Sequence, residues 1–214
     1  MRKKLVLSTI LVVTLIFGST VYAIMLNSDD YNVLDLSVVN NDKVIENTEI
    51  KKYIKDYALI EYIKNKTNLT EVESAFLLKQ CNEKDLNIFI VLGLMKVESN
   101  FNPKCVGALG ERGLGQLMEN TARQIAFNIN KEFKPELLFN PKYNIELFTT
   151  QLKYLNVIFN DDIHKVLTAY NRGEYGLRRY MASRSWTSNP AKSTYSEKVL
   201  KYAAMFQKEY QNWK

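Results

Sequence analysis

The fold is decided by the stretch DLNIFIVLGLMKVESNFNP, residues 85–103. From Ile88 to Met95 it is apolar without interruption, and a helix that is apolar nearly all round is a buried helix. Asn102-Pro103 must stop this helix, because the residue before a proline avoids helical backbone angles. The stretch therefore predicts a core helix, starting near Asn82 and Asp85, whose last turn carries Glu98.

The position of Glu98 is unusual for a carboxylate. On the predicted helix it shares a face with Val91, Leu94 and Met95, which are apolar. Loss of hydration and the negative end of the helix dipole both disfavour the charged form, so both raise the pKa of the carboxyl group. A carboxylic acid that keeps its proton near neutral pH is the group with which a glycosidase protonates a leaving oxygen. The alternative is an ordinary surface Glu that reaches solvent.

Three motifs in order along the chain point to one family. They are ESNFNP (98–103), GERGLGQLM (110–118) and AYNRG (169–173). Together they resemble the catalytic domain of lytic transglycosylases, the lysozyme-like enzymes that cleave bacterial peptidoglycan and are related to goose-type lysozyme. The resemblance covers about Leu69 to Tyr210. It implies a mainly α, lysozyme-like helical domain with at most a small irregular or β loop region.

The resemblance also implies a mechanism in which one carboxyl group does both proton transfers. Glu98 would protonate the β-1,4 bond between N-acetylmuramic acid and N-acetylglucosamine, and would then take the proton of the muramoyl C6 hydroxyl, so that a 1,6-anhydro product forms. Two alternatives stay open at this point. One is a muramidase of the same fold that adds water, and the other is a non-cutting glycan-binding or assembly component of an envelope-spanning machine.

Six further residues would form the site if the family pattern is carried over. Ser99 would lie beside the acid and order the cleft, and the segment with Gln116 would line the sugar site. Tyr170 and Asn171 would hold the acetamido group and the sugar ring, although a tyrosine is more often a core aromatic, and this chain has 13 of them. The substrate-binding residues predicted in this way are Ser99, Gln116, Met118, Tyr170, Asn171 and Tyr195.

The chain departs from the family pattern at several positions near the site. Gly107 stands where the family commonly has Ser, Glu111 where it has Ala, Gly115 where it has Met, and Phe148 where a Gly is frequent. We expect Gly115 to enlarge the space next to Gln116. Glu111 adds a carboxylate to this loop, which could orient a water and turn the lyase into a hydrolase. The other interpretation of Glu111 is a plain surface Glu.

The N-terminus reads as an export signal. Residues 2–4 are basic, residues 5–17 are apolar, and the 24 residues from Leu5 to Ser28 carry no charge. Val21-Tyr22-Ala23 suits a signal-peptidase site, yet the uncharged run is long enough to span a bilayer as an apolar helix and continues through Ile24-Met25-Leu26. Cleaved signal and retained anchor both stay open, and either one delivers the domain to the cell wall.

These features give a domain plan. Residues 1–26 are a signal peptide or membrane anchor, residues 27–68 a linker and an accessory helix, and residues 69–214 the lysozyme-like domain. Patterns S/T-x-x-E predict helix N-termini at Thr70 to Glu73 and at Thr194 to Glu197. The expected partners are peptidoglycan strands, the membrane through the N-terminal segment, and a secretion or sporulation machine.

Charge and metal-ligand chemistry exclude other classes. The net charge of +6 includes three cations in the N-terminal segment, and no basic stripe with interleaved aromatics indicates nucleic acid. His164 is the sole histidine, so neither a metal site nor a cofactor is expected. Cys81 and Cys105 flank the predicted core helix, whose length separates them, and we expect two unpaired thiols.

Overall fold

The computed structural model describes residues 10–17, 20–27 and 47–213. After Lys52 the chain divides into two compact units, which are described separately. In the first unit, β1 (Ile10–Phe17) and β2 (Thr20–Asn27) pair antiparallel, with Ile10 opposite Asn27 and Phe17 opposite Thr20.

These strands stand where the sequence predicted an apolar helix. A short apolar run fits a strand as well as a buried helix, and both segments are rich in Val, Ile and Thr, whose branched side chains favour strands. The basic residues 2–4 and most of the linker lie outside the described residues. Within the described ranges, no helix combines the length and the hydropathy needed to cross a membrane.

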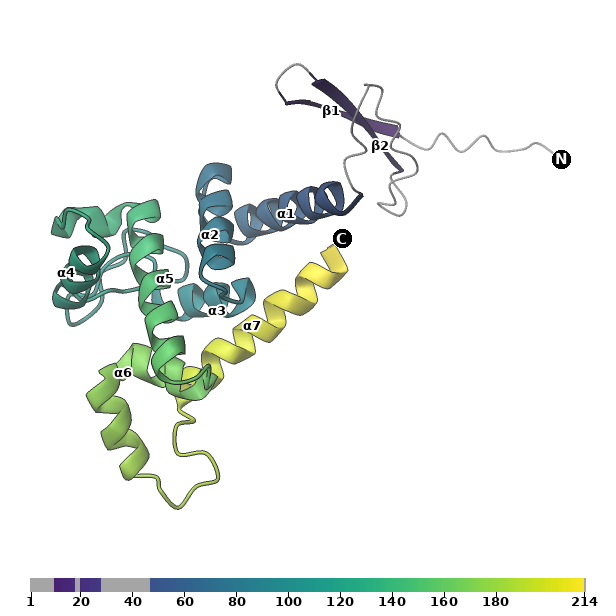
Figure 1. The fold of residues 1–214 in the computed structure, drawn as a ribbon. Coiled ribbons are helices and arrows are strands. Elements are labelled where there is room, and N and C mark those ends of the chain that lie inside the picture. Colours follow the sequence, from purple (N-terminus) through teal and green to yellow (C-terminus); the bar gives the residue numbers. More distant parts are fainter. Residues whose placement is uncertain (1–9, 18–19, 28–46, 214) are drawn as a thin grey trace. The chain divides into compact units, whose positions relative to one another are not determined.

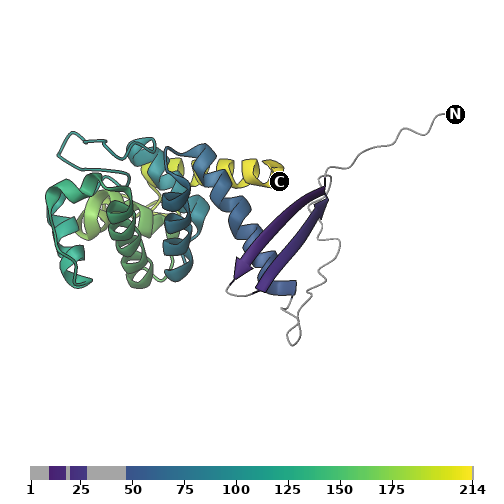
Figure 2. The same ribbon diagram turned by 90° about the horizontal axis from the view of Figure 1, so that it is seen from above.

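The second unit is helical, as predicted, and it starts at Tyr53 within α1 (Figure 1). The loop between α3 (Ile88–Ser99) and α4 (Glu119–Asn128) holds only isolated bridges, which pair Arg112 with Val106 and with Leu117. It lies at one edge of the helical body (Figure 2). It is the small β loop region that was expected. The helices are α1 (Asn47–Lys66), α2 (Glu71–Glu83), α3 (Ile88–Ser99), α4 (Glu119–Asn128), the 3-10 helix η1 (Pro135–Phe139), α5 (Pro141–Ile158), α6 (Ile163–Ala182) and α7 (Thr194–Trp213).

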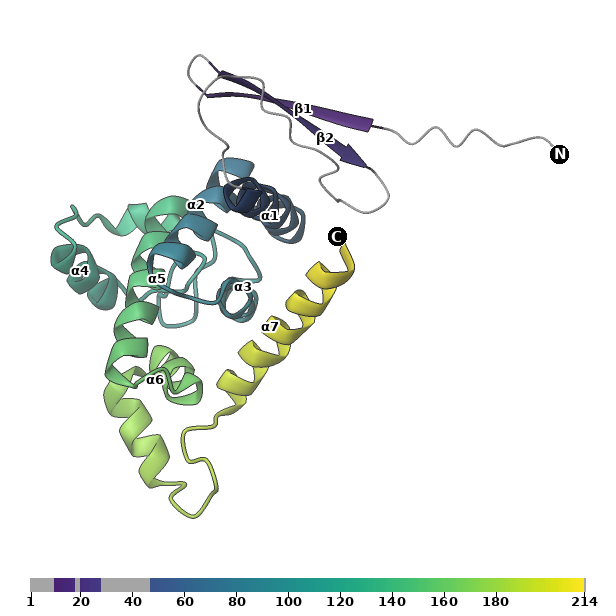
Figure 3. The same cartoon turned by 45° about the vertical axis from the view of Figure 1, so that its right-hand side comes forward.

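Helix α3 is the core helix that its apolar run predicted. Figure 3 views it nearly end-on, with α2 and α5 on one side and α7 on the other. Its inner side chains, Val91 to Met95, are almost fully buried. Burial of this order is the main favourable term in folding, about 1.5–3 kcal/mol for each large apolar side chain.

Helices α3 and α7 touch backbone to backbone at Gly93. A Cβ atom there would lie 2.5 Å from the carbonyl oxygen of Val199, so any larger residue would push the helices apart. The two helices run antiparallel, since Phe89 near the start of α3 meets Tyr210 near the end of α7, with ring centroids 5.7 Å apart. The first turn of α7 therefore lies beside the last turn of α3, where Glu98 is.

The N-terminus of α2 agrees with the sequence, while both ends of α3 differ from it. Thr70 and Glu73 form the predicted capping box of α2. Helix α3 begins later than expected, because the side chain of Asn87 accepts the backbone N–H groups of Phe89 and Ile90 and so caps the helix. It ends at Ser99, before Asn102-Pro103, because Asn100 and the following residue take left-handed backbone angles.

Helix α7 is capped one residue before the predicted position. Ser193 and Ser196 exchange hydrogen bonds between side chain and backbone, with distances of 3.0 and 3.1 Å. Glu197, which the S/T-x-x-E pattern assigned to the cap, instead pairs with Lys192 at 2.7 Å. The true capping box is therefore Ser193 to Ser196.

Candidate active site

The site is built around Glu98 in the last turn of α3. Its side chain is largely buried, and Oε1 accepts a hydrogen bond from the hydroxyl of Tyr195. Burial raises the pKa of the carboxyl group from 4.5 to about 7; the hydrogen bond from Tyr195 acts against this rise, and the charge of Glu111 adds to it. Glu98 is therefore an acid that holds its proton close to neutral pH.

Tyr195 reaches Glu98 from the first turn of α7, which a polar network fixes to α6. The hydroxyl groups of Thr168 and Ser193 lie 2.7 Å apart, and Nδ1 of His164 lies 2.9 Å from Oγ of Ser196. Thr168, Ser193 and Ser196 are almost fully buried. Sequence reasoning missed this network. The available signal was the three-residue spacing of Ser193 and Ser196, which suits reciprocal capping.

Tyr170 belongs to the same group of side chains. It projects from α6, and its hydroxyl donates to the carbonyl oxygen of Gly115 at 2.7 Å. Burial, followed by the nearby charge of Glu98, raises the pKa of both Tyr170 and Tyr195 well above the usual range. Both phenols therefore stay protonated and act as hydrogen-bond donors in the site.

Asn171 follows Tyr170 at the surface of α6. Its side chain is exposed and makes no hydrogen bond to another residue in the part of the chain that the structure describes. Two residues on, Gly173 interrupts the helix with φ of 71°, a backbone angle that favours glycine. Helix α6 is kinked at this position and continues to Ala182.

Ser99, the last residue of α3, and Gln116 both make hydrogen bonds to the backbone of the loop that follows α3. The buried hydroxyl of Ser99 donates to the carbonyl of Leu114 at 2.9 Å, so it orders the loop against α3. The side-chain amino group of Gln116 donates to the carbonyls of Cys105 and Gly113 at 3.1 and 2.9 Å. Met118 is exposed at the N-cap position of α4.

Asn144 supports this loop from α5 and was not among the predicted site residues. It is fully buried, and its Oδ1 accepts the backbone N–H of Gly115 at 2.9 Å. Its amino group donates to the carbonyls of Arg112 and Leu138 at 3.0 and 2.9 Å. A polar residue at a core position of an amphipathic helix was the signal that could have revealed it.

Gly115 does not open a space next to Gln116, contrary to expectation. A Cβ atom at Gly115 would lie 2.6 Å from Cβ of Phe148, so the aromatic side chain occupies this volume. Phe148 is itself fully buried. The glycine and the phenylalanine fit one another, and together with Asn144 they hold the carbonyl that Tyr170 contacts.

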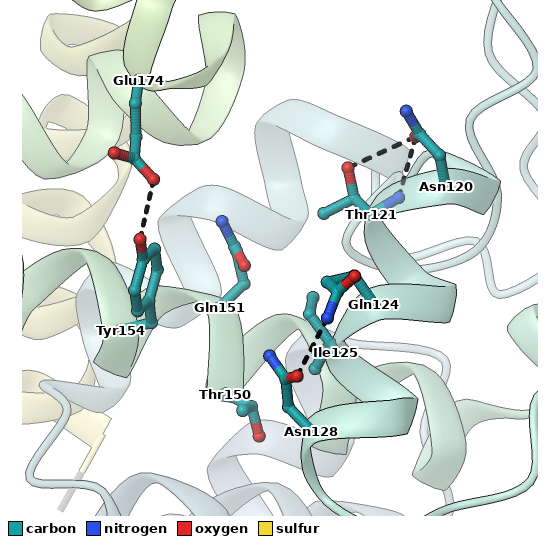
Figure 4. Close-up of a pocket in the computed structure, with 9 residues that line it drawn as sticks. All are labelled: Asn120, Thr121, Gln124, Ile125, Asn128, Thr150, Gln151, Tyr154 and Glu174. Atoms are coloured by element: carbon teal, nitrogen blue, oxygen red, sulfur yellow. Dashed lines mark hydrogen bonds between the residues drawn. The ribbon is translucent and has the colours of Figure 1, made fainter.

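A separate pocket of about 560 Å³ lies between α4, α5 and the second part of α6 (Figure 4). Its lining is mostly neutral and polar. The hydroxyl of Tyr154 donates to Glu174 at 2.9 Å, and the amino group of Gln124 donates to Asn128 at 3.0 Å. None of the predicted site residues lines it. The lining residues are Asn120, Thr121, Gln124, Ile125, Asn128, Thr150, Gln151, Tyr154 and Glu174.

Across the described residues, no group of three or more His, Cys, Asp or Glu side chains is arranged to hold a metal ion. Cys81 and Cys105 are both free thiols, and Cys81 is buried.

Comparison with solved structures defines the class of fold. The chain is similar to the 70 kDa soluble lytic transglycosylase of Escherichia coli, with a TM-score of 0.55 and 24% identity over 63% of this chain and 24% of that one. It is also similar to an inactive mutant of the lytic transglycosylase Slt of Pseudomonas aeruginosa, with a TM-score of 0.55 and 19% identity over 76% of this chain and 30% of that one. The fold is that of the lysozyme-like domain of lytic transglycosylases.

Sequence comparison gives the family. Residues 70–192 match the Transglycosylase SLT domain, and the chain belongs to this family. It is 33% identical over 104 residues to the membrane-bound lytic murein transglycosylase C of Photorhabdus laumondii. The matched region covers 44% of this chain and 29% of the relative. The chain thus spans less than a third of the length of that relative.

Proposed function

We propose that this protein is a peptidoglycan lytic transglycosylase that cleaves the bond between N-acetylmuramic acid and N-acetylglucosamine and leaves 1,6-anhydro ends. The observation that supports this function best is the raised pKa of the Glu98 carboxyl group. Its pKa of about 7 suits a group that must first give a proton and then take one at neutral pH.

The residues around Glu98 have distinct roles in this reaction. Glu98 protonates the oxygen of the leaving sugar, and its carboxylate then removes the proton of the C6 hydroxyl, whose oxygen closes the ring on C1. Tyr195 holds Oε1 of Glu98 by its hydrogen bond and so stabilises the carboxylate that forms between the two steps. Tyr170 and Asn171, adjacent on α6, contact the acetamido group and the ring.

The substrate proposal draws on the relatives and on the surface chemistry. Murein is named for the Photorhabdus relative. The pocket between α4 and α6 presents amides, hydroxyls and an aromatic ring, which suit sugar hydroxyl and acetamido groups.

The N-terminal segment bears on the place of action. We propose that the protein faces the cell wall from outside the cytoplasm, secreted or held at the membrane by residues 1–26, as the name of the membrane-bound relative supports. A small domain held in this way suits local wall opening for a secretion or sporulation machine. Affinity capture of the full chain from its native membranes that returns no assembly subunits would count against that partnership.

The decisive experiment is mass spectrometry of the fragments that the full chain releases from purified peptidoglycan, with and without borohydride. Transglycosylation predicts muramoyl ends one water lighter that resist reduction. Glu98→Gln keeps the shape of the side chain but carries no acidic proton, so it should slow release by about a hundredfold or more. Circular dichroism and glycan binding should match the wild type. A variant that still cuts would show that the acid is misassigned.

A further inference from the structure

The second part of α6 and the loop that joins it to α7 carry an excess of positive charge. Residues 171–193 hold five cations, four of them arginines, and one acid, Glu174. Glu174 already accepts a hydrogen bond from a tyrosine hydroxyl on α5, at 2.9 Å. Within the described part of the chain, Arg172, Arg179 and Arg184 form no ion pair. No direct contact with a described acid therefore neutralises these arginines.

Two glycines let Arg172 lie along the second part of α6. Gly173 kinks the helix directly after Arg172, and a Cβ atom at Gly176 would lie 2.8 Å from Cβ of Arg172. Because Gly176 has no side chain, Arg172 can pass over it. The guanidinium group of Arg172 reaches the ring of Tyr180 and lies 4.7 Å from the ring centroid. Arg172 is thus held on the second part of the helix, although it precedes the kink.

Tyr180 holds a second arginine, Arg184, from the loop after α6. The guanidinium group of Arg184 lies 5.3 Å from the same ring centroid, and the hydroxyl of Tyr180 donates to the carbonyl of Lys192 at 3.1 Å. Nε of Arg184 is buried without a hydrogen-bond partner among the described residues. Arg179 lies 5.9 Å from the ring centroid of Tyr175. Contacts with rings use the charge of a guanidinium group and leave its N–H donors for an anion.

Large aromatic side chains lie exposed among these arginines. Trp186 is 79% exposed and Tyr175 is 73% exposed. The second part of α6 and the loop before α7 project from the helical body (Figure 1 and Figure 3). A projecting end can meet a flat surface, whereas a polymer strand needs a groove. Tryptophan and tyrosine favour the boundary between lipid and water, because each has an apolar ring and a polar group.

We propose that an arginine–aromatic surface docks the helical domain on a bilayer that contains anionic phospholipid. The arginines bind headgroup phosphates, which a guanidinium group matches with two parallel hydrogen bonds, and the exposed rings enter the interfacial layer. Each basic residue close to an anionic membrane surface strengthens binding about fivefold. This contact depends neither on the N-terminal segment nor on the reaction proposed for Glu98. The surface consists of Arg172, Tyr175, Arg179, Tyr180, Arg184 and Trp186.

The test measures contact between Trp186 and lipid in the full chain. Trp213→Phe removes the other tryptophan, and this parent protein is added to vesicles of phosphatidylcholine with brominated acyl chains, which quench tryptophan on contact. When the vesicles also contain phosphatidylglycerol, the emission of Trp186 should move to shorter wavelength and be quenched, and high salt should reverse both effects. Phosphatidylcholine alone should change neither. Arg172→Gln and Arg184→Gln should each lower the ratio of quenched to unquenched Trp186 about fivefold.

The matched control is Arg123→Gln, which removes an arginine on α4 that also lies over an aromatic ring, 4.6 Å from the centroid of Phe133. Its quenching should equal that of the parent. Quenching that is absent, that is the same without phosphatidylglycerol, or that is unchanged in both arginine variants would overturn the proposal. Emission that responds to soluble polyglycerol phosphate or to peptidoglycan fragments, but not to vesicles, would also overturn it and would assign the surface to a wall polymer.

Discussion

The surroundings of Glu98 shift the pKa of its carboxyl group in opposite directions. The hydrogen bond from Tyr195 lowers the pKa of the carboxyl group, while burial and the charge of Glu111 raise it. Because the reaction starts with protonated Glu98, activity should fall as pH rises through this pKa of about 7. The high-pH limb of the profile therefore reports the balance of these contacts.

Tyr195→Phe removes the contact that lowers the pKa, so the high-pH limb of kcat/KM should move to higher pH. Glu111→Gln removes a contact that raises it, so the limb should move to lower pH. The measurement is the pH dependence of kcat/KM for the wild type and both variants. Shifts of both variants in the same direction would contradict the assignment of the limb to Glu98.

Single residues differ in how much of their surroundings the local sequence reveals. The burial of Glu98 could be predicted, because the apolar run that precedes it is local in the sequence. The filling of the space at Gly115 could not, because Phe148 comes from another helix and shares that volume only in the fold. Gly107 and Glu111 form a second pair, within one loop, because a Cβ atom at Gly107 would lie 2.3 Å from Oε2 of Glu111. Two departures from the family pattern that look independent in the sequence thus compensate one another in space.

Helix α7 delivers Tyr195, and its first turn depends on the Ser193 to Ser196 capping box. Ser193→Ala should cost about 1 kcal/mol in the free energy of unfolding. It should also lower kcat, because a looser first turn places Tyr195 less accurately on Glu98. Thr70→Ala is the matched control, since it removes the capping box of α2 at a similar cost.

Urea unfolding and kinetics on both variants separate the two roles of a cap. We expect a similar loss of stability in each and a loss of kcat in Ser193→Ala alone, restored by Ser193→Thr, which keeps the hydroxyl. Equal kcat values for Ser193→Ala and Thr70→Ala would show that the cap of α7 serves stability only.

Helices as a class could be predicted, but their ends depended on partners from elsewhere in the chain. Thr194 to Glu197 matches the capping pattern as well as Thr70 to Glu73 does. The cap shifted to Ser193 because Thr168 on α6 lies against its hydroxyl, a contact that no local pattern contains. The N-terminal strands show the same limit, since apolar composition alone does not separate strand from helix.

For the whole molecule, the ionised form of Glu98 opposes folding. In the unfolded chain its pKa is the ordinary 4.5, and in the fold it is about 7. Between these values the folded state holds the proton more firmly, so the contribution of this group to stability falls as pH rises through the window. Above about pH 7 the cost is complete and amounts to roughly 3 kcal/mol.

Glu98→Gln removes this cost, because the amide cannot ionise. The variant should therefore be more stable than the wild type at pH 8, by up to roughly 3 kcal/mol, and close to it at pH 4. Urea unfolding of both proteins at the two pH values measures the difference, and all other titrating groups cancel because the proteins share them. A difference that stays constant with pH would mean that Glu98 ionises as freely in the fold as in water. A difference that grows from pH 4 to pH 8 would show that the fold holds its acid at the expense of its own stability, as a site built for proton transfer requires.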